Sequence, residues 1–195
     1  MKERVDSNTY SILDLVRDLR LITSEVKDER RILQRVRPLA RRAALSKDSW
    51  LEKRFYSADL NQGFGIHLLH EEPDHTLAVF AVSWLPNRGT LVHDHGTWAV
   101  VVGVDGPERN VFYERIDDAS LPGYAELRVV GEKTFGAGEV LAMPAGGLHS
   151  IWNETDAVTV SLHVYGKHLN HTGRSQFDPE KRTVAPLAVR VESGE

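Results

Sequence analysis

The sequence predicts a mainly β protein, a sandwich or a barrel, with a helical segment in front of it. Before residue 38, apolar residues recur at three- and four-residue steps, which is the period of an amphipathic helix. From about residue 64, short runs rich in valine and aromatic residues alternate with turn residues. Strands spaced at roughly 8–12 residues with regular turn signals are typical of antiparallel sandwiches and barrels.

The helical segment is expected within residues 1–60, packed against the β-barrel. Pro38 is predicted to end or kink its first helix, because proline lacks a backbone N–H and its ring clashes with the preceding turn. A second short helix is expected over 48–56, with Trp50 and Leu51 facing inward. The apolar stripe of the first helix consists of Ile12, Leu13, Leu15, Val16, Leu19, Ile22, Val26, Ile32, Leu33 and Val36.

Strands are expected throughout residues 64–180. Glycine, proline and asparagine mark the breaks between them, as at Asp105-Gly106-Pro107. The stretch from about residue 178 is interpreted as a returning edge strand or a loosely held tail. We expect a single domain over 1–195. The predicted strands are 65–69, 76–84, 90–95, 98–103, 110–116, 125–134, 139–143, 149–153 and 159–165.

Composition excludes several classes of protein. A chain of 195 residues can bury a full core without disulfides, and its net charge of -4 argues against a nucleic-acid binder. With no cysteine, disulfides, thiolate metal ligands and a cysteine nucleophile are excluded. Neither a signal peptide nor a run of 18 apolar residues is visible, so we expect no membrane partner and a cytoplasmic location. The sequence leaves a homo-oligomer open.

Histidines form the main chemical signal. In a strand, residues i and i+2 point to the same face, so His93 and His95 could share one metal ion. A third histidine, His149, closes a stretch rich in glycine and proline. Taken alone, a His-x-His pair is an accidental feature of a surface or a core about as often as it is a metal site. The glycines and the proline could equally be plain turn residues.

The spacing around His149 is more specific. It fits G-x5-P-x-G-x2-H-x3-N at every fixed position and so resembles the second motif of the cupin superfamily; these positions are Gly138, Pro144, Gly146, His149 and Asn153. The first cupin motif, G-x5-HxH-x3-E-x6-G, is matched only in part. His93, His95 and Gly106 fit, whereas Asn87 and Ala99 stand where the opening glycine and the usual glutamate ligand belong. The resemblance implies a double-stranded β-helix (jelly-roll) barrel with a metal ion held by His93, His95 and His149.

The missing glutamate leaves three neutral histidines without a carboxylate, which resembles the thiol dioxygenases over residues 67–174. Trp84 stands nine residues before His93, and the segments HDHGTWAVVVGV (93–104) and SLHVY (161–165) are similar to the bacterial 3-mercaptopropionate enzymes. The resemblance implies an iron(II) cofactor. It also implies oxidation of a small thiol carboxylate by O2 to its sulfinate, with 3-mercaptopropionate preferred over cysteine.

The same resemblance implies roles for individual residues. Tyr165 would lie beside the substrate, His163 would orient Tyr165, and Ser161 would hold His163. Arg174 stands nine residues after Tyr165 and would clamp the substrate carboxylate, although a surface arginine is the plainer interpretation. In mammalian-type cysteine dioxygenases the clamp is an arginine on an early strand, and His67 occupies the counted position here.

Two other classes of function remain open. Three-histidine sites also activate water on zinc, so a zinc or nickel cupin acting as a lyase, isomerase or hydrolase is an alternative. A non-catalytic ligand-binding cupin is the other. For the leading hypothesis the expected partners are a small thiol and O2, with neither nucleic acid nor membrane.

Overall fold

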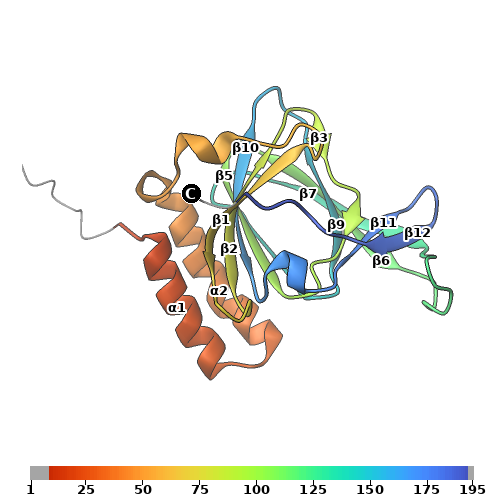
Figure 1. Cartoon of the computed structure of the whole chain (residues 1–195), viewed down its shortest axis with the longest axis horizontal. Helices are drawn as coiled ribbons and strands as arrows, with labels where there is room; N and C mark the ends of the chain where they lie inside the picture. The colour runs from red at the N-terminus through yellow and green to blue at the C-terminus, as the bar shows by residue number, and fades with distance from the viewer. Residues whose placement is uncertain (1–8, 193–195) are drawn as a thin grey trace, which may run out of the picture.

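The structure, a computed structural model, describes residues 9–192, in which two helices precede a barrel of two antiparallel sheets (Figure 1). Helix α1 is Ile12–Glu25 and helix α2 is Glu29–Leu45. The expected single helix is therefore two, because Asp28 caps a new N-terminus by accepting a hydrogen bond from the Arg31 amide. Among these residues no helix is both long and apolar enough to cross a membrane.

Of the two outcomes predicted for Pro38, a helix end or a kink, the helix end is wrong, because α2 continues through Pro38 to Leu45. Pro38 lies on the exposed side of the helix, as does Gln34, whose carbonyl loses its helical partner to the proline. Water can bond that carbonyl, while the opposite face stays buried. The second predicted helix, 48–56, is two short 3-10 turns instead, Lys47–Ser49 and Lys53–Tyr56.

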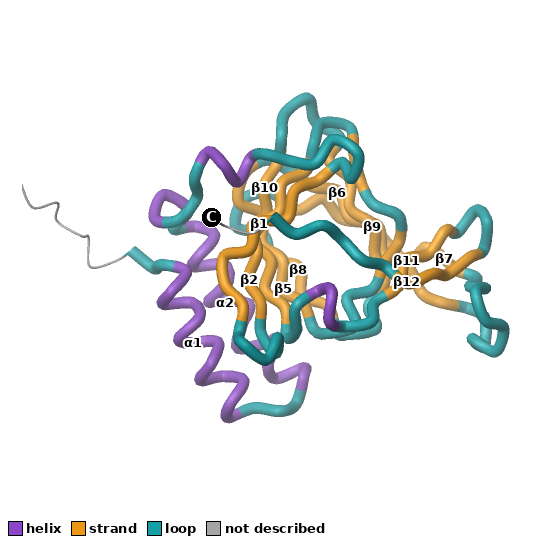
Figure 2. The backbone as a smooth tube through the Cα atoms, in the orientation of Figure 1, coloured by secondary structure: helices purple, strands orange, loops and turns teal. Residues whose placement is uncertain are grey.

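The first sheet lies under the helices, as Figure 2 shows. Helix α2 packs against β5, β8 and β10. Every residue of β2 and β10 is buried, because one face of this sheet meets the helices and the other faces the barrel interior. In spatial order its strands are β1 (Phe64–Glu71), β2 (Ala78–Trp84), β10 (Thr159–Tyr165), β5 (Ala99–Asp105) and β8 (Val140–Met143).

The second sheet closes the barrel opposite the helices. Its spatial order is β12 (Thr183–Pro186), β11 (Ser175–Asp178), β4 (Val92–His93), β9 (Leu148–Asn153), β6 (Glu108–Arg115) and β7 (Leu127–Phe135), with β3 (Arg88–Gly89) also on β9. From β4 to β11 the chain crosses repeatedly between the two sheets, as in a jelly roll. The predicted double-stranded β-helix with N-terminal helices is confirmed. Each predicted strand is present within a few residues, and β3 and β11 are additional. Strand β12 lies at the edge of the second sheet, in the stretch interpreted as a returning edge strand or a tail.

The last described residues, 187–192, form a segment that we call the C-terminal strap. It runs back from β12 across the barrel to β1 (Figure 1). The Leu187 amide donates to the Arg174 carbonyl at 2.9 Å, and the Glu192 amide donates to the Ile66 carbonyl at 2.7 Å. Backbone bonds therefore hold the strap at both of its ends.

Candidate metal and substrate site

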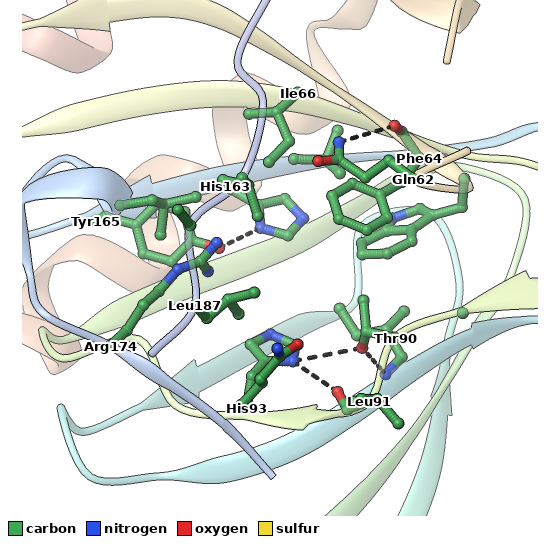
Figure 3. Close-up of a pocket in the computed structure, with 18 residues that line it drawn as sticks. Gln62, Phe64, Ile66, Thr90, Leu91, His93, His163, Tyr165, Arg174 and Leu187 are labelled. Carbon is green, nitrogen blue, oxygen red and sulfur yellow. Dashed lines mark hydrogen bonds between the residues drawn. The ribbon is translucent and has the colours of Figure 1, made fainter. Parts of the chain in front are cut away.

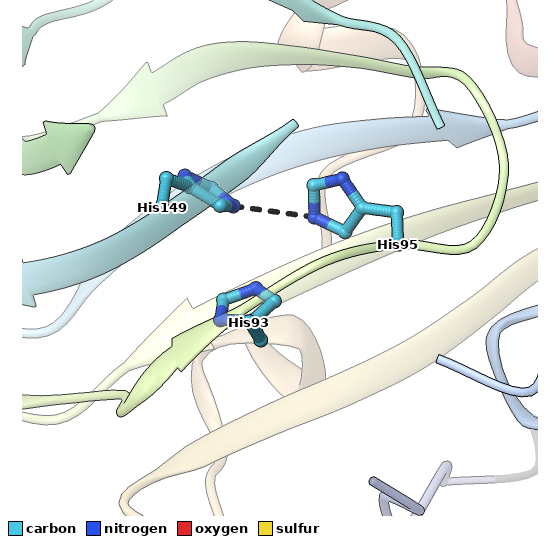
Figure 4. Close-up of side chains that lie close together, drawn as sticks. All are labelled: His93, His95 and His149. Carbon is cyan, nitrogen blue, oxygen red and sulfur yellow. Dashed lines mark hydrogen bonds between the residues drawn. The ribbon is translucent and has the colours of Figure 1, made fainter. Parts of the chain in front are cut away.

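Three histidines converge inside the barrel (Figure 4). His93 ends β4 and pairs directly with His149 on β9, so the sheet register sets these two side by side. His95 follows two residues after His93, beyond the end of the strand. All three are buried, and one nitrogen from each lies within 4.8 Å of the others.

A tight turn sets the position of His95. Gly96 follows it with φ of +61°, a left-handed conformation that favours glycine. A Cβ at Gly96 would also lie 2.8 Å from the carbonyl oxygen of Thr172. The HDHG segment therefore needs its glycine both for the turn and for the close approach of the loop after β10.

Hydrogen bonds fix how two of the rings are protonated. The Asn110 Nδ2 amide donates to the Glu108 carbonyl at 3.3 Å, so Asn110 Oδ1 faces His149 and accepts a hydrogen bond from His149 Nδ1 at 2.9 Å. His93 Nδ1 donates to the Leu91 carbonyl at 3.1 Å. Because Nδ1 carries the proton in both rings, Nε2 keeps a lone pair that a cation can bind.

Electrostatics also favour ligation. Burial lowers the pKa of His93 to about 4 and the pKa values of His95 and His149 well below the ordinary value, so all three rings are neutral near pH 7. His149 Nε2 and His95 Nε2 face one another at 3.2 Å. Three neutral imidazole donors fit a transition metal such as iron, zinc or nickel, so this group could hold a metal ion.

Among the described residues, no carboxylate belongs to the group of His93, His95 and His149. Ala99, where the usual cupin glutamate would stand, begins β5 and packs in the apolar cluster inside the barrel. The only charges in the group would thus be those of the bound ion, which keeps its full positive charge toward an anionic ligand.

A cavity of about 250 Å³ opens beside His93. Figure 3 shows side chains from both sheets and from the strap around it. Ile66 and Leu187 form part of its apolar wall, and His163, Tyr165 and Arg174 are among its polar groups. No aspartate or glutamate lines it among the described residues.

The predicted relay residues lie together on the inward face of β10. Ser161 Oγ is 2.8 Å from His163 Nε2, and His163 Nδ1 is 2.7 Å from the Tyr165 hydroxyl. Trp84 Nε1 donates to Ser161 Oγ at 3.2 Å. The ring centres of Tyr165 and His95 are 5.1 Å apart, so the chain of hydrogen bonds ends next to the histidine group.

Arg174 lies in the same cavity, beside Tyr165 (Figure 3). Only 4% of it is exposed, its Nε has no hydrogen-bond partner, and it forms no ion pair within 4 Å among the described residues. Desolvation lowers the pKa of its guanidinium, although the group remains a cation near pH 7. A buried cation without a partner is costly, so this position favours an anionic ligand.

The strand that sequence reasoning missed, β11, is what places Arg174. In the pairing of β11 with β4, Gln176 is opposite His93. Asp94 adds a bond from the Ser175 amide to its Oδ2 at 3.3 Å. Arg174 immediately precedes Ser175, so the pairing of β11 with β4 holds Arg174 near the histidines.

The structure does not bring His67 to the cavity. On β1, His67 pairs with Ala81, whose side chain belongs to the core under the helices. Its Nε2 bonds to the Ser57 carbonyl at 2.9 Å. Its neighbour Ile66 faces the cavity instead, because successive residues of a strand point to opposite faces.

Sequence reasoning missed two polar residues, Glu108 and Asn110, which share the inward face of β6. Asn110 orients His149, as described above. Glu108 is 3% exposed, and the Thr159 hydroxyl donates to its Oε1 at 3.2 Å. Burial raises the pKa of Glu108 to about 8. The sequence signal that could have identified Glu108 and Asn110 is their two-residue spacing directly after the Gly106-Pro107 break.

A second group of potential ligands, Glu71, His75 and His171, lies where the β1–β2 turn meets the loop after β10. The rings of His75 and His171 are stacked, with centres 3.6 Å apart and planes 10° from parallel. The lone pair of an imidazole nitrogen lies in the plane of its ring, so these two do not point at one position. This group is a histidine stack rather than a formed metal site.

No family model matches the chain. Among solved structures, the chain is similar to an oxalate oxidase in complex with the substrate analogue glycolate, at 15% identity and a TM-score of 0.43, over 62% of this chain and 63% of that one. It is also similar to the DMSP lyase DddQ from Ruegeria pomeroyi DSS-3, at 17% identity and a TM-score of 0.45, over 64% and 56%.

A third similar structure is an uncharacterised conserved protein with a double-stranded β-helix domain from Klebsiella pneumoniae, at 13% identity and a TM-score of 0.45. The match covers 66% of this chain and 96% of that one. The chain spans less than two thirds of the oxalate oxidase and of the lyase. Similarities this distant do not bear on activity.

Proposed function

We propose that this protein is a non-haem iron(II) thiol dioxygenase that oxidises a small thiol carboxylate to its sulfinate with O2. One observation carries the proposal: His93, which belongs to a carboxylate-free group of three histidines, lines the same cavity as Tyr165 and the buried Arg174, which forms no ion pair among the described residues. The resemblance in the HxH and S-x-H-x-Y segments agrees with it.

Arg174 is proposed to bind the carboxylate of the substrate. Its planar guanidinium can form a bidentate pair with a carboxylate, and burial strengthens that pair because water does not compete. The cavity offers no acidic side chain to an ammonium group among the described residues. This supports 3-mercaptopropionate, which has no amine, over cysteine.

The proposed ligands of the iron are His93, His95 and His149. When bound, iron(II) would supply a site for the thiolate and the electrons that O2 chemistry requires, which zinc cannot do. The balanced reaction is one thiol plus one O2 giving one sulfinic acid, with both oxygen atoms on sulfur. Asn110 and the Leu91 carbonyl keep the His149 and His93 rings in the ligating tautomer.

Tyr165 is proposed to hold a proton at the edge of the cavity. Burial raises the pKa of its phenol, so the hydroxyl stays protonated across the working pH range. His163 bonds this hydroxyl and fixes its direction. Apolar residues such as Ile66 and Leu187 exclude water from the substrate.

The direct test is oxygen uptake by iron-loaded protein with 3-mercaptopropionate, cysteine, cysteamine and propionate. We expect uptake with 3-mercaptopropionate, less with cysteine, and none with propionate, which lacks sulfur. His149→Ala should lose most of the iron and the uptake. Zinc or nickel retained from expression, with no thiol-dependent uptake after iron loading, would reject the proposal and favour the lyase, isomerase or hydrolase alternative.

A further inference from the structure

Two polar side chains in the wall of the cavity have no hydrogen-bond partner among the described residues, and they come from one short segment. One is Arg174, and the other is Gln176, whose half-buried side-chain amide forms no hydrogen bond there. The other polar side chains of the wall are all bonded within the protein: Gln62, Trp84, Thr90, His93, His163 and Tyr165.

Strand geometry puts the two unpartnered side chains on the same face. Gln176 is two residues after Arg174, and residues i and i+2 of an extended chain point to one side. The chain is extended at Arg174 as well, because the pairing of β11 with β12 continues there through the bond from the Leu187 amide to the Arg174 carbonyl. Phe177, the next residue, points the other way, into a separate apolar cluster with Val92.

The same pair lies next to the histidine group. Gln176 is the partner of His93 in the pairing of β11 with β4. The Cβ atoms of residues directly opposite in an antiparallel pair are roughly 4.5–5.5 Å apart. The Asp94 amide donates to the Ser175 carbonyl at 3.2 Å, which continues this pairing toward Arg174. A ligand that lies between the guanidinium and the histidines is therefore within reach of the Gln176 amide.

A carboxylate matches the hydrogen-bonding groups of both side chains. An ionised carboxylate accepts at about four lone-pair sites, and the planar fork of an arginine fills two of them. A primary amide has two N–H donors and can fill another site without bringing a second charge that must be desolvated. Since neither side chain has a partner to give up, binding breaks no hydrogen bond within the described part of the protein.

We propose that Gln176 binds the substrate together with Arg174, by donating a side-chain N–H to the carboxylate that the guanidinium holds. Because Gln176 is uncharged, it adds a hydrogen bond and leaves the positive charge of Arg174 available to the ligand. This role rests on the proposed function for the identity of the acid, whereas the carboxylate site itself does not.

The first test measures the dissociation constant of propionate for the protein as purified. Propionate carries the carboxylate and no sulfur, so its binding requires neither turnover nor O2. Gln176→Leu, which is similar in size and has no donor, should weaken binding roughly tenfold or more, the scale of a hydrogen bond to a charged group. Gln176→Glu should weaken it further, because the new carboxylate pairs with Arg174 and repels the ligand. Gln34→Leu, on the exposed side of α2, is the matched control and should bind as the wild-type protein does.

The second test detects the contact itself and separates it from a structural role of Gln176. The chain has three glutamines, so NMR of protein with labelled glutamine side-chain amides gives few signals. The signal that disappears in Gln176→Leu and in Gln176→Glu belongs to Gln176. It should shift when propionate is added to the wild-type protein, and the Gln34 signal should not. In Arg174→Ala the same propionate concentration should shift it far less.

Unchanged propionate binding in Gln176→Leu, or a Gln176 signal that does not respond to propionate, would overturn the proposal. An undiminished shift in Arg174→Ala would also overturn it, because the two side chains would then not share one ligand. Should Gln176→Leu fail to fold, Gln176→Glu identifies the signal and the wild-type and Arg174→Ala proteins decide. A propionate-dependent shift without thiol-dependent oxygen uptake would reject the proposed reaction and retain the carboxylate site; oxygen uptake with an unresponsive Gln176 would do the reverse.

Discussion

The two faces of strand β10 are equally buried and do different things. The outward face carries Val160, Leu162 and Val164, which pack beneath the helices. The inward face carries a serine, a histidine and a tyrosine, linked by hydrogen bonds and directed at the cavity. Burial alone therefore does not separate stabilising from functional positions in this barrel. The chemistry of alternate residues does, since successive side chains point to opposite faces.

The outward face can be weakened without touching the inward one. Leu162→Ala should lower the free energy of unfolding by roughly 2–5 kcal/mol, because a fully buried leucine is replaced by a cavity. Denaturant titration measures this. The exposed Leu121→Ala is the control, with an expected change within about 0.5 kcal/mol. Folded Leu162→Ala protein should keep its iron content; loss of iron would show that the two faces are not separable.

The inward cavity is expected to depend most on Arg174. Arg174→Ala should weaken transition-state binding of thiol carboxylates by roughly 2–4 kcal/mol, the scale of a broken buried charge pair. Steady-state kcat/KM measures it, and Arg174→Lys should recover only part because an ammonium lacks the planar fork.

Two controls sharpen that prediction. Cysteamine, which has no carboxylate, should be affected far less than 3-mercaptopropionate. His67→Asn, on the opposite face of β1, should leave KM unchanged. Equal losses for both thiols in Arg174→Ala would point to a structural role for the arginine. A raised KM in His67→Asn would show that His67 contributes to binding the substrate carboxylate.

Tyr165→Phe removes one hydroxyl from the inward face and keeps the ring. We expect kcat to fall roughly ten- to a hundredfold, or about 1.4–2.7 kcal/mol, with iron content nearly unchanged. Stability should change little, since the ring still packs with Phe80. Full turnover in this variant would contradict a role for the hydroxyl.

The last change is the smallest when taken per pH unit, and it distinguishes the inward carboxyl from any apolar neighbour. The pKa of Glu108 is raised from 4.5 to about 8 in the folded state, so the folded protein binds more protons than the unfolded chain between these values. Stability should thus fall as pH rises through this window, by at most about 1.4 kcal/mol per pH unit. Glu108→Gln should lack this slope in urea titrations at successive pH values; an unchanged slope would assign it to other groups.

Sequence reasoning succeeded where a short pattern determines geometry. The alternation of Ser161, His163 and Tyr165 among apolar residues predicts one polar face, and the pattern around His149 predicts its place. It did not predict that α2 continues through Pro38. Whether a proline ends a helix depends on whether the carbonyl that loses its hydrogen bond, here that of Gln34, lies on the exposed or the buried side of the helix. Sequence reasoning also counted His67 one position away from the inward face, and a slip of one residue exchanges the two faces of a strand.

Other features depend on contacts that no local pattern records. Strand β11 is short and largely polar, with Phe177 as its one fully buried residue, and it exists because it pairs with β4 some eighty residues earlier. Glu108 looks in sequence like an ordinary surface glutamate in a charged strand. Only the approach of β10 from the opposite sheet buries it against the Thr159 hydroxyl.

The C-terminal strap has a consequence for how the molecule is made. Leu187, Ala188 and Val189 wall the cavity, yet they follow every barrel strand in the chain. A barrel folded as far as Pro186 already carries all three histidines and Arg174, but its cavity lacks one wall. Ions and small molecules therefore have an open route into the barrel until the strap docks.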